Sequence, residues 1–326
     1  MIQSLKIVTP IAVALAITAC SSNEGSLIAP ATATQGTVPA QPSVGLSPNR
    51  KRAHTATTAT YIYVSNQGIN SNGDTLLVYP AGVVNPAPIA SHVLGVGTLP
   101  KGVATDHEGN VYVVLEHTST VDVFSRGGGS LKYAITNGVS GPFGVTVDSN
   151  DNLYVGNIGG NHISVYSHGS KTPFATITDF PTGFILAGGL VTDTSGNVYA
   201  DESTHAGAVV EVCTPVTGVG IPTCSLLGAP IVAAAQGGIA FDALGDLAVG
   251  GATLLTYYAP PSWQEVGHTT YPNAVEYLTE GPDEGLYIPL NGNNGNGSVV
   301  VIPATGTHQY SITNGDNYPW GAASGI

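Results

Sequence analysis

Histidines and carboxylates that follow three short apolar segments are the first candidates for chemistry in this chain. Glu116-His117 follows one segment, His162 follows the next, and Asp201-Glu202 with His205 follow a third. Imidazole and carboxylate groups are common ligands of calcium or zinc, so converging segment ends could hold a divalent metal. The alternative is that these are polar loop residues and that His162 holds a structural place in the sequence repeat.

Glu276 is a further candidate because its surroundings in the sequence are apolar. Aligning Pro272–Glu276 with Pro100–Ala104 places Glu276 where the equivalent segments carry Ala, Thr or Val. A carboxylate on an inner strand breaks the local pattern, which favours a functional or strained position. A side chain that lines a hydrated channel explains the same residue equally well. We name four weak metal-ligand candidates on these grounds: His117, His162, His205 and Glu276.

A candidate binding face collects the polar residues that follow the recurring apolar segments, together with Glu276. Its members are Asn66, Glu116, His117, Asn157, His162, Asp201, Glu202, His205, Glu276 and Asn291. We assign no catalytic residue. The chain has no nucleophile elbow of the hydrolase type and no phosphate-binding or dinucleotide-binding glycine motif.

The segments that would position these residues recur with a tyrosine near their start. Taking Tyr63, Tyr112, Tyr154, Tyr199, Ala248 and Tyr287 as markers, the intervals lie between 39 and 49 residues. Such a period, with several short strands in each unit, is typical of a β-propeller. We therefore predict an all-β propeller of four-stranded antiparallel blades over residues 58–326.

Each repeat carries an aspartate followed by Gly-Asn or a similar pair, just before its tyrosine strand. Asp106, Asp148, Asp193 and Asp242 occupy this place. An aspartate at the start of a tight hairpin accepts backbone N–H groups of the turn, and the glycine supplies a positive φ. We therefore interpret these four carboxylates as turn-forming rather than as a functional ring.

The repeat resembles that of the NHL-repeat propellers and of gluconolactonase-like (regucalcin-like) proteins. The stretch Pro100–Tyr112 matches the Pro-x-Gly-Val-Ala half of the NHL repeat, and Asn161-His162 falls at its Asn-His pair. The resemblance implies a six-bladed ring and, for the gluconolactonase-like group, a metal-dependent lactonase. That group's Glu-Gly-Pro opens its fold, whereas Glu280-Gly281-Pro282 stands in the last repeat, so this ligand assignment does not transfer.

Six repeats predict six blades, with the first and last parts of the domain joined. Tyr61–Val64 has no inner strand before it, and Pro319–Ala323 matches Pro100–Ala104. The C-terminal segment should therefore complete the first blade and close the ring. Seven blades are the alternative, with a degenerate unit within Asp179–Gly188 or Val83–Leu94.

The N-terminus predicts export and lipid anchoring. An apolar run ends at Ile17-Thr18-Ala19-Cys20, which resembles a bacterial lipobox, although a secretory signal with a chance cysteine is the alternative. Residues 1–19 are then the signal peptide, and residues 20–57 a lipidated cysteine with a disordered tether. We expect a location in the bacterial cell envelope, anchored through lipid at Cys20, at the outer membrane, its periplasmic side or the cell surface.

The two remaining cysteines, Cys213 and Cys224, flank a turn-rich stretch between consecutive strands. In an oxidising compartment they are expected to form a disulfide, with two buried thiols as the alternative.

The net charge of the chain limits the kinds of partner that it can bind. The chain has 21 acidic and 8 basic residues, a balance that disfavours nucleic acid. We expect a monomeric envelope-binding module that recognises protein or carbohydrate. The alternative is a metal-dependent lactonase or lyase with its site in the central funnel.

Overall fold

The computed structural model describes residues 58–68, 73–181, 187–204, 207–216, 222–227, 236–292, 295–304, 309–315 and 318–326. The predicted signal peptide, Cys20, the tether and His205 lie outside these residues. Within them every regular element is a β-strand. No helix in this part of the chain is long and apolar enough to span a membrane.

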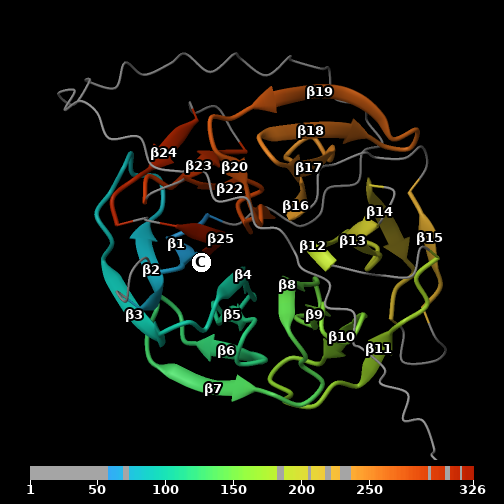
Figure 1. The fold of residues 1–326 in the computed structure, drawn as a ribbon, viewed down its shortest axis with the longest axis horizontal. Coiled ribbons are helices and arrows are strands. Elements are labelled where there is room, and N and C mark those ends of the chain that lie inside the picture. Colours follow the sequence, from blue (N-terminus) through green and yellow to red (C-terminus); the bar gives the residue numbers. More distant parts are fainter. Residues whose placement is uncertain are drawn as a thin grey trace, which may run out of the picture. The chain divides into compact units, whose positions relative to one another are not determined.

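The strands form six antiparallel sheets arranged as the blades of a ring, as the sequence predicts (Figure 1). In each blade the first-named strand is the innermost and the last is the outermost. Blade one is β25 (Pro319–Gly325), β1 (Tyr61–Asn66), β2 (Asp74–Pro80) and β3 (Ala90–Gly95). Blade two is β4 (Pro100–Thr105), β5 (Val111–Leu115), β6 (Thr120–Phe124) and β7 (Leu131–Ile135). Blade three is β8 (Pro142–Val147), β9 (Leu153–Asn157), β10 (His162–Tyr166) and β11 (Ala175–Ile177).

The remaining blades follow the same order. Blade four is β12 (Ala187–Thr192), β13 (Val198–Thr204), β14 (Gly207–Cys213) and β15 (Cys224–Leu226). Blade five is β16 (Gln236–Phe241), β17 (Leu247–Gly251), β18 (Leu254–Ala259) and β19 (Gln264–Thr270). Blade six has a split inner strand, β20 (Ala274–Val275) and β21 (Thr279–Glu280), followed by β22 (Leu286–Asn291), β23 (Ser298–Ile302) and β24 (Tyr310–Ile312).

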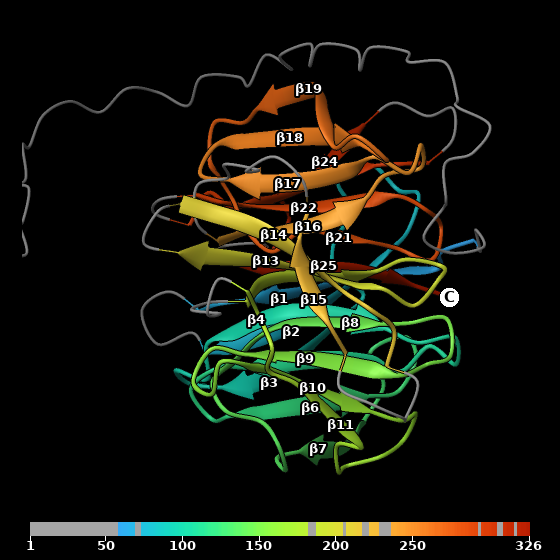
Figure 2. The same ribbon diagram turned by 90° about the vertical axis from the view of Figure 1, so that its right-hand side faces the viewer.

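The ring closes as predicted, because β25 pairs antiparallel with β1 in a register that sets Ala323 opposite Tyr63. The inner strands of successive blades contact one another around the axis. Figure 2 shows β8 and β9 extending along the ring axis from one face to the other. The interval proposed for a seventh blade, Val83–Leu94, leads instead into the outer strand of blade one, β3.

The hydrophobic core lies between blades rather than within them. Six clusters of buried side chains fill the six junctions, each with residues from both adjoining blades. At the junction of blades two and three, for example, Tyr112 and Val114 belong to the same cluster as Val145 and Val155. Because a blade alone cannot bury its two faces, ring closure removes the last exposed pair of faces from water.

The recurring tyrosine is explained by the hairpin aspartate beside it. Asp106 Oδ1 accepts the N–H groups of Glu108 and Asn110, and its Oδ2 accepts the Tyr112 hydroxyl at 2.8 Å. Tyr154 and Tyr199 donate in the same way to Asp148 and Asp193. The predicted turn-forming role of these carboxylates is confirmed, and the tyrosine fastens each hairpin to the strand that follows.

The predicted disulfide is also confirmed. Cys213 and Cys224 are bonded across β14 and β15, at a sequence separation of 11. The bond holds the short outer strand of blade four against its neighbour, where only three residue pairs are in register.

Candidate functional site

The two faces of the ring are built from different connections. On one face, the loop that follows each tyrosine strand meets the loop that enters the inner strand. Glu116 and His117 donate their N–H groups to the carbonyls of Leu99 and Thr98, each at 3.1 Å. We call this the loop face. The opposite face carries the aspartate hairpins and is called the hairpin face.

The inner strand of blade six is shifted relative to the register that its proline predicts. Thr279 lies opposite Tyr287 as Ala104 lies opposite Tyr112, so Thr279 and not Glu276 holds the Ala104 position. Glu276 is instead the counterpart of Lys101. The alignment on Pro272 was wrong because the strand is split, with three residues between β20 and β21.

Tyr277 consequently takes a place that is glycine in every other blade. Its five counterparts by register are Gly102, Gly144, Gly189, Gly238 and Gly321. A Cβ atom added to Gly102 would lie 3.0 Å from the Tyr277 ring, which shows that the ring occupies space that the glycines leave. Gly102, Gly144 and Gly238 lie against Tyr277 and leave room for this one large side chain.

The Tyr277 hydroxyl crosses from blade six to blades three and four. It accepts the N–H of Val145 at 2.8 Å and that of Leu190 at 3.3 Å, and donates to the Val145 carbonyl at 2.8 Å. Tyr277 is 1% exposed, and burial raises its pKa. This side chain closes the axis between the two faces with its hydrogen bonds satisfied.

Lys101 lies on the loop-face side of this closure, among aromatic rings and carboxylates. Its Nζ atom is 3.1 Å from the ring centre of Trp320, 5.0 Å from that of Phe143 and 3.5 Å from Glu116 Oε2. Burial lowers the pKa of Lys101, while Glu116 and Glu276 oppose the shift. The ammonium group is therefore held by cation–π contacts and by one half-exposed carboxylate.

Glu276 is buried near Lys101, and burial raises its pKa to about 7. A hydrogen bond from Asn291 and the charge of Lys101 oppose that rise. The Oδ1 atom of Asn291 is buried and has no hydrogen-bond partner in the described structure. Glu276 can therefore exchange a proton near neutral pH, beside an amide oxygen with unused accepting capacity.

Asp201 is a second buried carboxyl group close to the axis. It is 1% exposed, and burial raises its pKa to about 7, opposed by a hydrogen bond from the backbone of Gly238. Its Oδ2 atom has no hydrogen-bond partner in the part of the chain described. Its neighbour Glu202 is fully buried on the same strand. The charge of Asp201 also contributes to the raised pKa of Tyr277.

The predicted histidine ligands occupy separate surroundings. His117 is exposed, with Nδ1 3.0 Å from the Gly97 carbonyl, whereas His162 Nε2 lies 3.4 Å from the Gly138 carbonyl. His205 lies outside the described residues. Among those that are described, no group of three or more His, Cys, Asp or Glu side chains is arranged to hold a metal ion.

The two asparagines of the candidate face fasten loops. Asn66 Oδ1 accepts the N–H of Tyr318 at 2.8 Å, where the chain enters β25. Asn157 Oδ1 accepts the N–H of Ser140 at 2.8 Å, where the chain approaches β8. Their side chains therefore hold the loop face together.

Of the sequence candidates, the structure brings Glu116, Glu276 and Asn291 together around Lys101. Sequence reasoning missed Lys101, Trp320 and Tyr277. An alignment of blade six on its tyrosine strand rather than on Pro272 would have exposed Tyr277 as the exception to five glycines.

Comparison with known proteins defines the fold alone. No protein-family model matches this chain, and no curated protein matches it. A crystal structure of a protein of unknown function from Bacteroides caccae is similar, with a TM-score of 0.62 and 14% identity over 82% of this chain and 99% of that one. A streptogramin B lyase structure gives a TM-score of 0.49 and 14% identity over 81% of this chain and 78% of the other.

Proposed function

We propose that this chain is an exported, lipid-anchored binding module whose loop face binds an uncharged carbohydrate at the ring axis. The observation that carries the proposal is the unused hydrogen-bonding capacity around Glu276. Asn291 Oδ1, beside Glu276, is a buried oxygen atom without a partner in the described structure, and Asp201 Oδ2, beside Gly238, is another. Buried polar atoms are normally satisfied, and exceptions mark functional sites.

The unused atoms are acceptors, so a matching ligand must supply donors. Sugar hydroxyl groups do so, and their C–H faces pack against aromatic rings such as those of Trp320 and Tyr318, whose centres lie 6.3 Å apart. The formal net charge of −13 disfavours anionic glycans. A neutral, hydroxyl-rich ligand therefore fits the chemistry of this face better than an acidic one.

Lipid at Cys20 and the tether would hold the ring at the bacterial envelope while leaving it free to reach a ligand. This part of the proposal rests on the lipobox-like sequence. Metabolic labelling with a fatty acid tests it, because labelling should be lost in Cys20→Ala. Persistent labelling of that variant would contradict the anchor assignment.

Binding is tested by screening purified residues 58–326 against neutral oligosaccharides and measuring hits by isothermal titration calorimetry. Glu276→Gln and Asn291→Ala should each weaken binding at least tenfold, since each removes one of the polar groups to which the proposal assigns the ligand. Glu265→Gln is the control, because it removes one negative charge from the outer strand β19.

Two outcomes would overturn the proposal. If the domain binds a protein tightly and binds none of the glycans, the ligand is a protein rather than a carbohydrate. Hydrolysis of lactones that is abolished by a chelator and by His117→Ala would support the metal-dependent lactonase that the sequence resemblance suggests.

A further inference from the structure

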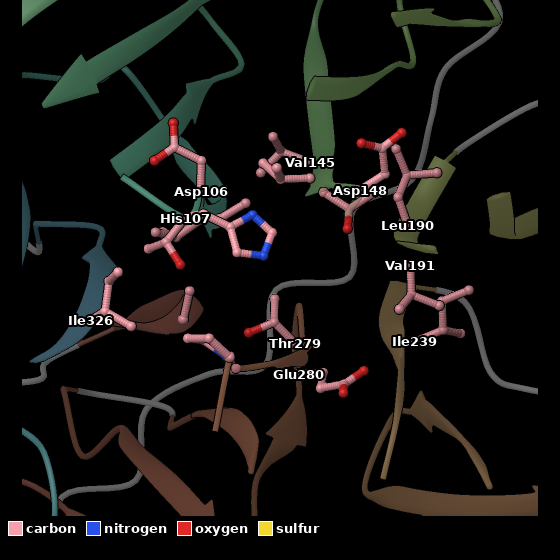
Figure 3. A pocket seen from close by; sticks show the side chains of 18 residues that line it. Asp106, His107, Val145, Asp148, Leu190, Val191, Ile239, Thr279, Glu280 and Ile326 are labelled. Atoms are coloured by element: carbon pink, nitrogen blue, oxygen red, sulfur yellow. The ribbon is translucent and has the colours of Figure 1, made fainter. Parts of the chain in front are cut away.

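A pocket opens on the hairpin face, where Asp106, His107, Asp148 and Glu280 lie around it (Figure 3). It has a volume of about 90 Å³. A cavity of about 150 Å³ accommodates benzene, so this one suits a ligand of only a few heavy atoms. The hairpin-face pocket plays no part in the function proposed above, and its occupancy is independent of it.

Aliphatic side chains from several blades form most of its wall. They include Val103 of blade two, Val145 of blade three, Leu190 of blade four and Ile239 of blade five. Val145 and Leu190 are also the residues whose backbone groups bind the Tyr277 hydroxyl. The Tyr277 hydroxyl thus holds the backbone of two residues that line the pocket.

Most polar groups of the pocket already have partners. Asp106 and Asp148 are occupied by their own hairpins. Thr279 donates its hydroxyl to the Ala322 carbonyl, and His107 at the rim pairs with Asp151. These groups define the edge of the pocket but offer little to a ligand.

Glu280 differs from all of them. It lines the pocket, and its Oε2 atom is buried without a hydrogen-bond partner in the described structure. By register its counterparts in the other blades are Thr105, Val147, Thr192, Phe241 and Ser324, none of which is a carboxylate. A partly buried, unpaired carboxyl group in an aliphatic pocket is costly unless a partner arrives.

The surrounding charges specify the sign of that partner. The neighbours that act on Glu280 are Glu284 and Asp283 on its own hairpin and Asp242 on blade five. Across the pocket lie Asp106, His107 and Asp148, and the described residues that line it include no lysine or arginine. A cation is attracted to such a site and an anion is repelled.

We propose that the hairpin-face pocket binds a small primary ammonium ion, with its charged group on Glu280 and its short alkyl chain against the aliphatic wall. A metal ion fits less well, since one unused carboxylate provides too few oxygen ligands and the wall is apolar. An alkylammonium ion satisfies both halves of the site at once, because it joins a charged donor to an apolar body.

Binding of the ammonium ion should be coupled to the loss of a proton from Glu280. Burial, together with Glu284, Asp242 and Asp283, raises the pKa of Glu280 well above its ordinary value. An ammonium ion therefore competes with a proton for this carboxyl group, so affinity should increase as pH rises and a proton should be released on binding.

The experiment titrates n-propylammonium into residues 58–326 by calorimetry, with n-propanol as the uncharged analogue. Wild-type protein should bind the amine at least tenfold more tightly than the alcohol, and Glu280→Gln should lose at least tenfold in amine affinity. Glu265→Gln, which removes an exposed carboxylate of blade five, should leave amine affinity within twofold of wild type.

A second measurement needs no variant. Repeating the wild-type titration near neutral pH, in two buffers with different ionisation enthalpies, should reveal net release of protons on binding. No binding, equal binding of amine and alcohol, or binding without proton release would each overturn the proposal.

Discussion

At two equivalent positions of the inner strand, blade six carries large or acidic side chains where the five other blades carry small or uncharged ones. Where the others carry glycine, blade six carries Tyr277. Where blade two carries Thr105, blade six carries Glu280, a carboxylate with a buried and unpaired oxygen in the described structure. Five blades supply a ring with room at its centre, and one blade fills that room and places acidic groups at both ends of the closure.

The difference shows how a repeat protein divides its residues between structure and chemistry. The aspartate–tyrosine hydrogen bond recurs because each blade must hold its own hairpin. Glu276, Tyr277 and Glu280 are found in blade six alone, because the space at the centre of the ring can hold only one such set of side chains. The following experiments test whether blade six is in fact the exceptional one.

The largest expected effect follows removal of the Tyr277 ring. Tyr277→Ala should lower the free energy of unfolding by about 3–5 kcal/mol, because it leaves a cavity beside Gly102, Gly144 and Gly238. Urea denaturation measures the loss. Tyr277→Phe keeps the ring and should lose only about 1–3 kcal/mol, through the unsatisfied groups of Val145 and Leu190. Equal effects of the two variants would show that the ring does not fill the axis.

The pH dependence of stability should depend on Glu276. Its pKa is about 7 in the folded protein against an ordinary value of 4.5, so the folded state holds the proton more tightly. The resulting stabilisation is fully present below about pH 4 and is lost as pH rises to about 7, which amounts to about 3 kcal/mol.

Glu276→Gln removes this titration. The difference in unfolding free energy between wild type and variant should therefore move by that amount between pH 4 and pH 8, to the relative disadvantage of wild type at pH 8. A difference that stays constant with pH would show that burial does not raise the pKa of Glu276.

The disulfide lies in blade four, outside the blade-six residues compared above. Replacing Cys213 and Cys224 together by serine should cost about 2–3 kcal/mol, through the larger entropy of the unfolded chain. Thermal denaturation measures this loss, whereas carbohydrate and amine affinities should stay within twofold of wild type. A large loss of binding would show that blade four, and not only blade six, shapes the axial sites.

The smallest expected effect is the difference in stability lost when the aspartate of each of two hairpins is replaced. Asp148 accepts hydrogen bonds from two backbone N–H groups, from the Asn152 side-chain amide and from the Tyr154 hydroxyl. Asp242 accepts the corresponding backbone bonds in blade five, where Asp246 replaces the asparagine and Ala248 replaces the tyrosine. Asp148→Ala should therefore destabilise the protein by about 1 kcal/mol more than Asp242→Ala in urea denaturation. The reverse order would contradict the stabilising role given to the tyrosine and asparagine side chains.

The sequence predicted what is local and repeated. The blade number, ring closure by Pro319 onward and the hairpin aspartates all depend on short patterns that recur at a fixed interval. The disulfide followed because Cys213 and Cys224 flank a single turn. Each of these features is decided by residues that are close in the chain or by a register that repeats.

The features that the sequence did not predict depend on contacts between blades that occur only once in the ring. The split of the inner strand into β20 and β21 moves Glu276 away from the predicted position, and no repeat could show it. The contact of Lys101 with Trp320 joins blades two and one through residues far apart in sequence. The Glu280 pocket arises only when several blades meet at the axis.

The most direct test of the blade-six account is to follow the side-chain carboxyl ¹³C shifts by NMR as a function of pH, with Glu276→Gln and Glu280→Gln for assignment. The account predicts that Glu276 titrates near pH 7 and that Glu280 titrates well above the ordinary glutamate range. Titration of both groups near pH 4 would show that blade six places solvated carboxylates at the axis, and would contradict the account.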